Sequence, residues 1–324
     1  MIVTASAPGK LLLLGDHAVV YDHPCIVTAV DIRYMVTLET VTDMNITIST
    51  PLLEKKKISR IVSLEDVGIS SIQETSFVEA AISNVFRKFN IKSGLLMHTN
   101  GPIESYGLGS SSAVVVATIS ALSLAFNLNL SPLQIFNLAY QAVLDVQGKG
   151  SGFDVASAIW GGTLYYVTGG KTIEPLNIDE IPITIGYSGK KVSTANLVEQ
   201  VYKLRQKQPD IIDTIFALSH KLVDEAKASL LQSDWLILGE LLNINQGLLD
   251  ALGVSTSKLA NLIFSSRDAG ALGAKLSGAG RGDCMFALQL SDKKGNVQTA
   301  IKQAGGEVVN IPINAKGAYA TILS

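Results

Sequence analysis

Gly107-Leu108-Gly109-Ser110-Ser111-Ser112 stands directly before a long apolar run, residues 113–126, and this junction decides the fold of the chain. The run has the length and composition of a buried helix. The glycines allow a tight turn and a close approach to a ligand, and the serines can cap the helix. Because free N–H groups and hydroxyls at a helix N-terminus bind anions, the segment predicts a site for nucleotide phosphates. A serine-rich cap on a core helix is the alternative for this segment alone.

The composition is that of a large globular protein. Its 324 residues, 47% hydrophobic and 17% charged, are enough for two domains with a sizeable core. A formal net charge of -2 gives no sign of nucleic-acid binding. Two distant cysteines, Cys25 and Cys284, predict neither a disulfide framework nor a metal site. The N-terminus lacks the features of a signal peptide, and no apolar run approaches the roughly 18 residues that span a membrane. We therefore expect a cytoplasmic protein.

Both halves of the chain mix strand and helix patterns, which predicts the α+β class. Strands are expected at 2–7, 11–15, 26–29, 35–40, 45–49, 95–99, 163–167, 183–187, 274–277, 284–290, 307–311 and 318–323. Helices are expected at 76–90, 113–126, 132–146, 155–160, 194–206, 211–228, 234–252, 257–269 and 296–304. Gly169-Gly170-Lys171 is the best candidate for a domain boundary, which gives domains 1–170 and 171–324.

A second cluster, Ser6-Ala7-Pro8-Gly9-Lys10, places a lysine at an expected turn between two apolar runs. Burying an ammonium group is costly without an anion, and a phosphate would remove that cost. We therefore expect Lys10 beside a phosphate group. A solvent-exposed bend is the alternative for this residue.

Two further glycine-rich clusters carry charged side chains. In residues 147–154 three glycines alternate with polar residues, and Asp154 opens a short helix either as a catalytic carboxylate or as an N-cap. In residues 275–284 a glycine-rich turn between strands can approach a phosphate closely. Arg281 adds a planar fork of donors that suits phosphate.

These four clusters, in this order and over nearly the whole chain, resemble the GHMP kinase superfamily, which includes galactokinase, homoserine kinase, mevalonate kinase and phosphomevalonate kinase. The resemblance implies a two-domain fold, an S5-like α/β domain followed by a ferredoxin-like α+β domain, with the active site in the cleft between them. It also implies ATP and Mg²⁺. ATP would be bound by Gly107, Leu108, Gly109, Ser110, Ser111 and Ser112, with Ser111 also as the metal ligand.

The clusters differ in which member of the superfamily they resemble. Residues 14–21 are similar to mevalonate kinase, whereas residues 147–156, 187–198 and 277–284 resemble phosphomevalonate kinase. Because three of these four segments resemble phosphomevalonate kinase, the resemblance implies transfer of the γ-phosphoryl group of ATP to 5-phosphomevalonate. The products would be 5-diphosphomevalonate, which is used in isoprenoid biosynthesis, and ADP. The alternative is mevalonate kinase, with a hydroxyl acceptor. A decarboxylase or a non-catalytic member of the superfamily is less compatible with the retained cluster residues.

The resemblance also implies roles for single residues. Lys10 would stabilise the transferred and acceptor oxygens. The substrate would be bound by His17, Ser151, Lys190, Ser193, Thr194, Gly280 and Arg281. Because a phosphate monoester has a second pKa of about 6, a general base would gain little, and we expect Asp154 mainly to orient other groups.

One departure from mevalonate kinases concerns the metal. Val143 stands where those enzymes place a magnesium-binding glutamate, and Asp145 nearby is expected to face elsewhere. Mg²⁺ would then be held by one serine, the nucleotide and water, which suits its preference for retained waters. We expect no nucleic-acid or membrane partner, and a monomer or homodimer.

Overall fold

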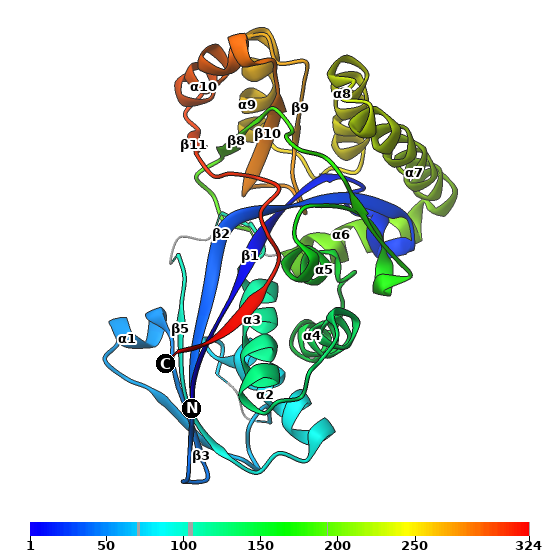
Figure 1. The fold of residues 1–324 in the computed structure, drawn as a ribbon. Coiled ribbons are helices and arrows are strands. Elements are labelled where there is room, and N and C mark those ends of the chain that lie inside the picture. The colour runs from blue at the N-terminus through cyan, green and yellow to red at the C-terminus, as the bar shows by residue number, and fades with distance from the viewer. Residues whose placement is uncertain (70–71, 103–105, 193, 324) are drawn as a thin grey trace.

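The computed structural model describes residues 1–69, 72–102, 106–192 and 194–323 and arranges them around two β-sheets (Figure 1). The larger sheet has the order β12-β1-β2-β5-β3-β4, with β6 paired to β2 and β7 paired to β6. Its strands are β1 (Ile2–Leu14), β2 (Pro24–Val41), β3 (Asn45–Ser49), β4 (Arg60–Ser63), β5 (Gly94–Asn100), β6 (Thr163–Val167), β7 (Thr172–Leu176) and β12 (Tyr319–Leu323). The smaller sheet has the order β11-β8-β10-β9 and consists of β8 (Ile183–Tyr187), β9 (Gly273–Leu276), β10 (Cys284–Leu288) and β11 (Glu307–Val309).

Helices cover each sheet with their apolar sides. On the larger sheet lie α2 (Ser76–Phe89), α3 (Ser110–Ala125), α4 (Pro132–Gln147) and α5 (Phe153–Trp160), with α3 directly against β1 and β2 (Figure 1). The second group is α6 (Thr194–Lys207), α7 (Pro209–Leu231), α8 (Trp235–Ala251), α9 (Ser257–Asp268) and α10 (Lys294–Gln303). In it α8 and α9 pack against β9, and α10 packs against β11. None of the helices in the described ranges is long and apolar enough to cross a membrane.

The α+β class predicted from the sequence is confirmed, but two pairs of expected strands are single long strands. Residues 2–7 and 11–15 belong to β1, and residues 26–29 and 35–40 belong to β2. The pairing of β1 with β2 shifts register between Pro8 and Gly9, which is a β-bulge. The additional residues, Asp31 and Ile32, lie on β2, and because proline is tolerated at such irregularities, β1 continues through Pro8 and Gly9. Lys10 therefore lies within a strand and not at a turn.

Residues around 170 form a tight turn, and the division into domains 1–170 and 171–324 stays a prediction. Gly169 and Gly170 have positive φ angles and close a hairpin between β6 and β7, so the expected boundary falls inside the larger sheet. The last strand, β12, returns to pair with β1. The short elements α1 (Pro51–Lys55), β4 and β7 have no counterpart in the sequence analysis. The sequence does contain a helix-start signal for α1, because Thr50 is a favoured N-cap residue and Pro51 is favoured at the first helical position.

A buried ion pair joins the end of β1 to the smaller sheet. The Nζ of Lys275 on β9 donates to Oδ2 of Asp16 at 2.7 Å, and both side chains are fully buried. The other carboxylate oxygen of Asp16 accepts the N–H of Gly278 at 2.7 Å. Burial lowers the pKa of Lys275, and the charge of Asp16 opposes that shift. Beside this pair, the Ser277 hydroxyl donates to the carbonyl of Leu12 and accepts its N–H.

Replacing Lys275 by methionine is expected to destabilise the protein by about 3 kcal/mol, because it leaves the Asp16 carboxylate buried without its cation. The measurement is the midpoint of thermal unfolding. The control is Lys56→Met, which removes an exposed ion pair with Glu74 and should leave the midpoint unchanged. Equal midpoints for the two variants would contradict this account of the buried pair.

Candidate active site

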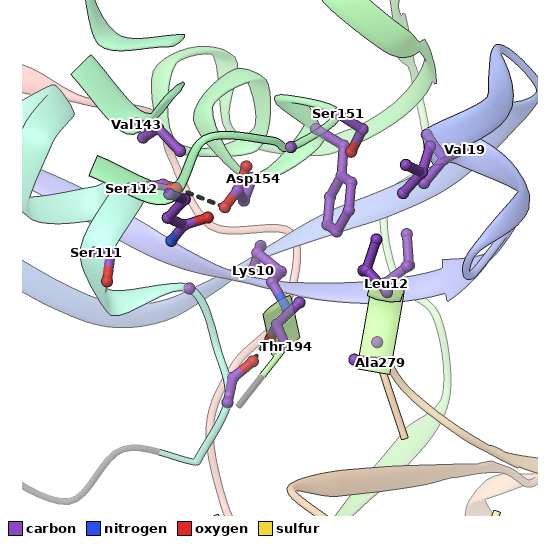
Figure 2. Close-up of a pocket in the computed structure, with 18 of the residues that line it drawn as sticks. Lys10, Leu12, Val19, Ser111, Ser112, Val143, Ser151, Asp154, Thr194 and Ala279 are labelled. Atoms are coloured by element: carbon purple, nitrogen blue, oxygen red, sulfur yellow. Dashed lines mark hydrogen bonds between the residues drawn. The ribbon is translucent and has the colours of Figure 1, made fainter. Parts of the chain in front are cut away.

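A cavity of about 250 Å³ lies where the two sheets meet. Its walls come from β1, the N-terminus of α3, the end of α4, the loop before α5, the residues Lys191, Val192 and Thr194, and the segment 277–279 (Figure 2). All four clusters singled out in the sequence contribute to it. The cavity therefore brings together segments that are more than 250 residues apart in the chain.

The Gly/Ser segment forms the N-terminus of α3, with Gly109 as the N-cap residue at φ 86° and Ser110 as the first helical residue. The serines therefore do not cap the helix as predicted. Ser110, Ser111 and Ser112 instead occupy its first turn and line the cavity, where backbone N–H groups lack partners within the helix. The geometry fits an anion such as a phosphate chain. Leu108 is buried, and its carbonyl accepts the N–H of Lys10 at 2.8 Å.

The two glycines of this segment make room for functional side chains. A Cβ on Gly109 would come within 2.9 Å of Cγ of Lys10. A Cβ on Gly107 would lie 2.5 Å from Cγ of Asp283. Side chains from β1 and from the turn before β10 thus occupy the space that the glycines leave open.

Lys10 reaches into the cavity from β1, and its side chain is only 9% exposed. Its Nζ donates to the carbonyl of Gly107 at 3.0 Å and lies 5.6 Å from the centre of the Phe153 ring. A buried ammonium group in this position is suited to bind a phosphate, because the anion would balance its charge.

Asp154 lies opposite Lys10 and points into the cavity (Figure 2). The N-cap of α5 is Gly152, so Asp154 is the second residue of the helix and is not its N-cap. Its Oδ2 accepts the hydroxyl of Ser112 at 2.5 Å, which fixes the carboxylate. Ser151, also in the cavity wall, is held because its carbonyl accepts the hydroxyl of Tyr166 at 2.6 Å.

His17 forms another part of the wall and is 6% exposed. Its Nε2 lies 3.0 Å from the carbonyl of Ala279, and because a carbonyl only accepts, Nε2 carries the proton. Nδ1 is then an acceptor in the neutral ring. Burial lowers the pKa of His17, while the hydrogen bond to Ala279 and the charge of Asp16 oppose that shift.

Several residues that the sequence analysis assigned to the substrate do not line the cavity. Arg281 is exposed, and its Nε and Nη2 both donate to the carbonyl of Gly253 at 3.2 Å. Gly280 packs against the backbone of Val254, and the exposed Lys190 contributes a carbonyl that accepts the N–H of Asp283. Ser193 lies outside the described residues. Thr194 does line the cavity.

The cavity also contains residues to which the sequence analysis gave no role. Lys191 lines it where Lys190 does not, and Asp283 adds a second carboxylate. Both lysines are exposed, and the sequence does not show which of the two contributes to the cavity lining. Phe153 and an apolar wall that includes Leu12, Val19 and Val192 complete the lining. For these residues no local pattern separates a cavity wall from a hydrophobic core.

The groups available to a metal are few. Ser111 lines the cavity, as does Val143 from α4. Asp145 is turned away and accepts the side-chain amides of Asn84 and Gln141. Within the described ranges no group of three or more His, Cys, Asp or Glu side chains is arranged to hold a metal ion. A metal here would take most of its ligands from phosphate and water, which is the coordination that Mg²⁺ prefers.

Two family patterns match this chain. The pattern of the GHMP kinases N terminal domain matches residues 76–162, and that of the GHMP kinases C terminal domain matches residues 226–307. A mevalonate kinase of Thermococcus sibiricus is 40% identical, and the alignment covers 98% of each chain.

Solved structures show the same fold. The L. major mevalonate kinase in complex with R-mevalonate has a TM-score of 0.76 at 27% identity and covers 95% of this chain and 94% of its own. A Streptococcus pneumoniae phosphomevalonate kinase has a TM-score of 0.79 at 19% identity, covering 96% and 99%, and that likeness concerns the fold alone. The two-domain GHMP kinase fold is thus confirmed. For the acceptor, these relatives support the mevalonate alternative better than the expected phosphomevalonate.

The imidazole of His17 is expected to stay neutral until the pH falls below about 6.5, the ordinary histidine pKa. Burial disfavours its charged form, so protonation at lower pH also reduces the stability of the fold. Nitrogen NMR of labelled protein measures both the tautomer and the titration. The unfolded chain in denaturant supplies the reference. A His17 ring that carries its proton on Nδ1, or that titrates above the reference, would refute the assignment.

Proposed function

This chain belongs to the GHMP kinase family, and from that membership we propose that it is a mevalonate kinase. It transfers the γ-phosphoryl group of ATP to the 5-hydroxyl of mevalonate. The observation that carries the proposal is its likeness, over 98% of both chains, to a mevalonate kinase at 40% identity.

The cavity supports a hydroxyl acceptor on independent grounds. Two cations expected to receive an acceptor phosphate, Lys190 and Arg281, are exposed and do not line the cavity. Among the described residues of the segment after β8, Lys191 and Thr194 line the cavity and contribute one cation and one hydroxyl. Another wall of the cavity is apolar, formed in part by Leu12 and Val19, and suits the carbon skeleton of a small acid.

A hydroxyl acceptor changes the role of Asp154. The hydroxyl must lose a proton during transfer, so a carboxylate in the cavity gains a task that an ionised phosphate would not give it. Asp154 is held by the hydroxyl of Ser112 and points into the space beside Lys10. In this proposal Asp154 accepts the acceptor proton and Lys10 stabilises the charge on the transferred oxygens.

The segment from Gly107 to Ser112 fits the phosphate chain of ATP, because positive φ angles at Gly107 and Gly109 turn the backbone into the first turn of α3. Mg²⁺, which neutralises charge on the phosphates when bound, would be held by Ser111 together with nucleotide oxygens and water. The residues of the cavity fit such a water-rich ion, since Val143 contributes no oxygen ligand.

The acceptor is tested by incubating the purified protein with ATP and Mg²⁺ and either mevalonate or 5-phosphomevalonate. We expect ADP to form with mevalonate and the product to carry one phosphate. The Lys10→Met variant, purified in the same way, controls for contaminating kinases. Turnover of 5-phosphomevalonate in place of mevalonate would refute the proposal, and release of carbon dioxide would indicate a decarboxylase.

Asp154→Asn is expected to lower kcat by about 10²- to 10⁴-fold, because the amide cannot accept the acceptor proton. The KM for ATP should change little, since the nucleotide segment is intact. Steady-state kinetics measure both constants. Asp145→Asn, a change of the same chemistry on a residue turned away from the cavity, should leave both unchanged. If Asp154→Asn retains kcat within a few-fold, Asp154 only orients its neighbours.

A further inference from the structure

Asp283 is fixed by loops of the second domain and lines the cavity. Its N–H donates to the carbonyl of Lys190 at 2.7 Å, and its carbonyl accepts the N–H of Ser188 at 2.9 Å. The backbone has φ 54°, in the left-handed region that is uncommon for non-glycine residues but that aspartate adopts more readily than most. The position of this carboxylate is therefore set by the segment that follows β8.

The carboxylate of Asp283 packs on the backbone of Gly107. A Cβ on Gly107 would lie 2.5 Å from its Cγ and 2.6 Å from its Oδ2. Among the described residues, its Oδ1 is buried without a hydrogen-bond partner. Such a group costs free energy, so its retention calls for a compensating role.

Charged groups face Asp283 from two elements. They are Lys10 on β1 and Lys191 in the segment after β8. The next residue in the chain, Cys284, is a further titratable group; burial raises the pKa of its thiol, and the charge of Asp283 adds to that shift. Burial raises the pKa of the Asp283 carboxyl, whereas the charge of Lys10 and a hydrogen bond from the Val192 amide oppose the rise. The carboxylate thus lies within the field of the ammonium group assigned to phosphoryl transfer.

Gly107 connects the two charges. Its carbonyl accepts Nζ of Lys10 at 3.0 Å, and the Asp283 carboxylate lies against its backbone. Building on the proposed kinase function, we propose that Asp283 is a positioning residue for phosphoryl transfer. Through Gly107 and through its charge, Asp283 holds Lys10 at the place where the transferred oxygens develop charge. It thereby links the residues after β8, which contact its backbone, to residues 107–112, which we propose to bind the nucleotide.

Asp283→Asn tests this role, because it keeps the volume and removes the charge. We expect kcat with mevalonate to fall about 10-fold or more, since small misplacement of a catalytic group is costly. The thermal midpoint should not fall, because a neutral amide removes the cost of burying a charged carboxylate. Asp292→Asn, an exposed position in the same domain, is the matched control and should change neither value.

The pH profile separates positioning from a merely structural role. In the unaltered protein, kcat/KM should decline as pH falls through the raised pKa of Asp283, because protonation removes the charge that holds Lys10. In Asp283→Asn this acidic limb should move to lower pH. Unchanged kcat, or a lower kcat with the acidic limb in its original place, would overturn the inference.

A second measurement needs no acceptor and remains decisive if mevalonate is not the substrate. Removing the Asp283 charge should loosen Lys10 from the Gly107 carbonyl, so acetic anhydride should acylate Lys10 faster in Asp283→Asn. Mass spectrometry of the labelled peptide gives the rate. Equal labelling rates in both proteins would overturn the inference. Absence of mevalonate turnover in the unaltered protein, with faster labelling in the variant, would instead refute only the proposed function.

Discussion

The Asp16 carboxylate joins the two halves of the cavity, because one oxygen binds the buried Lys275 ammonium and the other binds the Gly278 amide. Both charges are fully buried, so neither is stable there without the other. The arrangement sets the register between the end of β1 and the turn after β9. His17 follows Asp16 directly and reaches Ala279 in the same turn. The position of the wall that contains His17 and Ala279 thus depends on this buried ion pair.

Steric constraints act at the other side of the cavity. Gly107 and Gly109 lack side chains at the two points where Asp283 and Lys10 approach the backbone. Glycine is therefore required at both positions because the side chains of Asp283 and Lys10 come close to the backbone there. A phosphate bound at this segment would have the same requirement. This dependence connects residues 107–112 to β1 and to the turn before β10. A change at either glycine would displace a charged side chain as well as the backbone.

Three polar side chains of the cavity form hydrogen bonds with neutral partners. Lys10 donates to a carbonyl, Asp154 accepts a serine hydroxyl, and His17 donates to a carbonyl as a neutral ring. Lys10 and Asp154 therefore keep their charge available for a substrate, in positions fixed before it binds. Such preorganisation is the main source of catalysis in phosphoryl transfer. It also explains how a site with few metal-binding side chains can serve this chemistry.

The sequence by itself determined the α+β class, nearly all of the helices and strands, and some of the residues around the cavity, among them Lys10, Ser111 and Asp154. It could do so because these features depend on local periodicity, on capping residues and on glycine-rich turns. Only the tertiary structure decided that Lys10 lies within strand β1, that Lys191 lines the cavity in place of Lys190, and that Arg281 is bound to Gly253. The direction of a side chain depends on what packs against it, and those partners are distant in sequence. For the same reason the roles of Asp16 and Asp283 followed only from contacts with residues 259 and 176 positions away, Lys275 and Gly107.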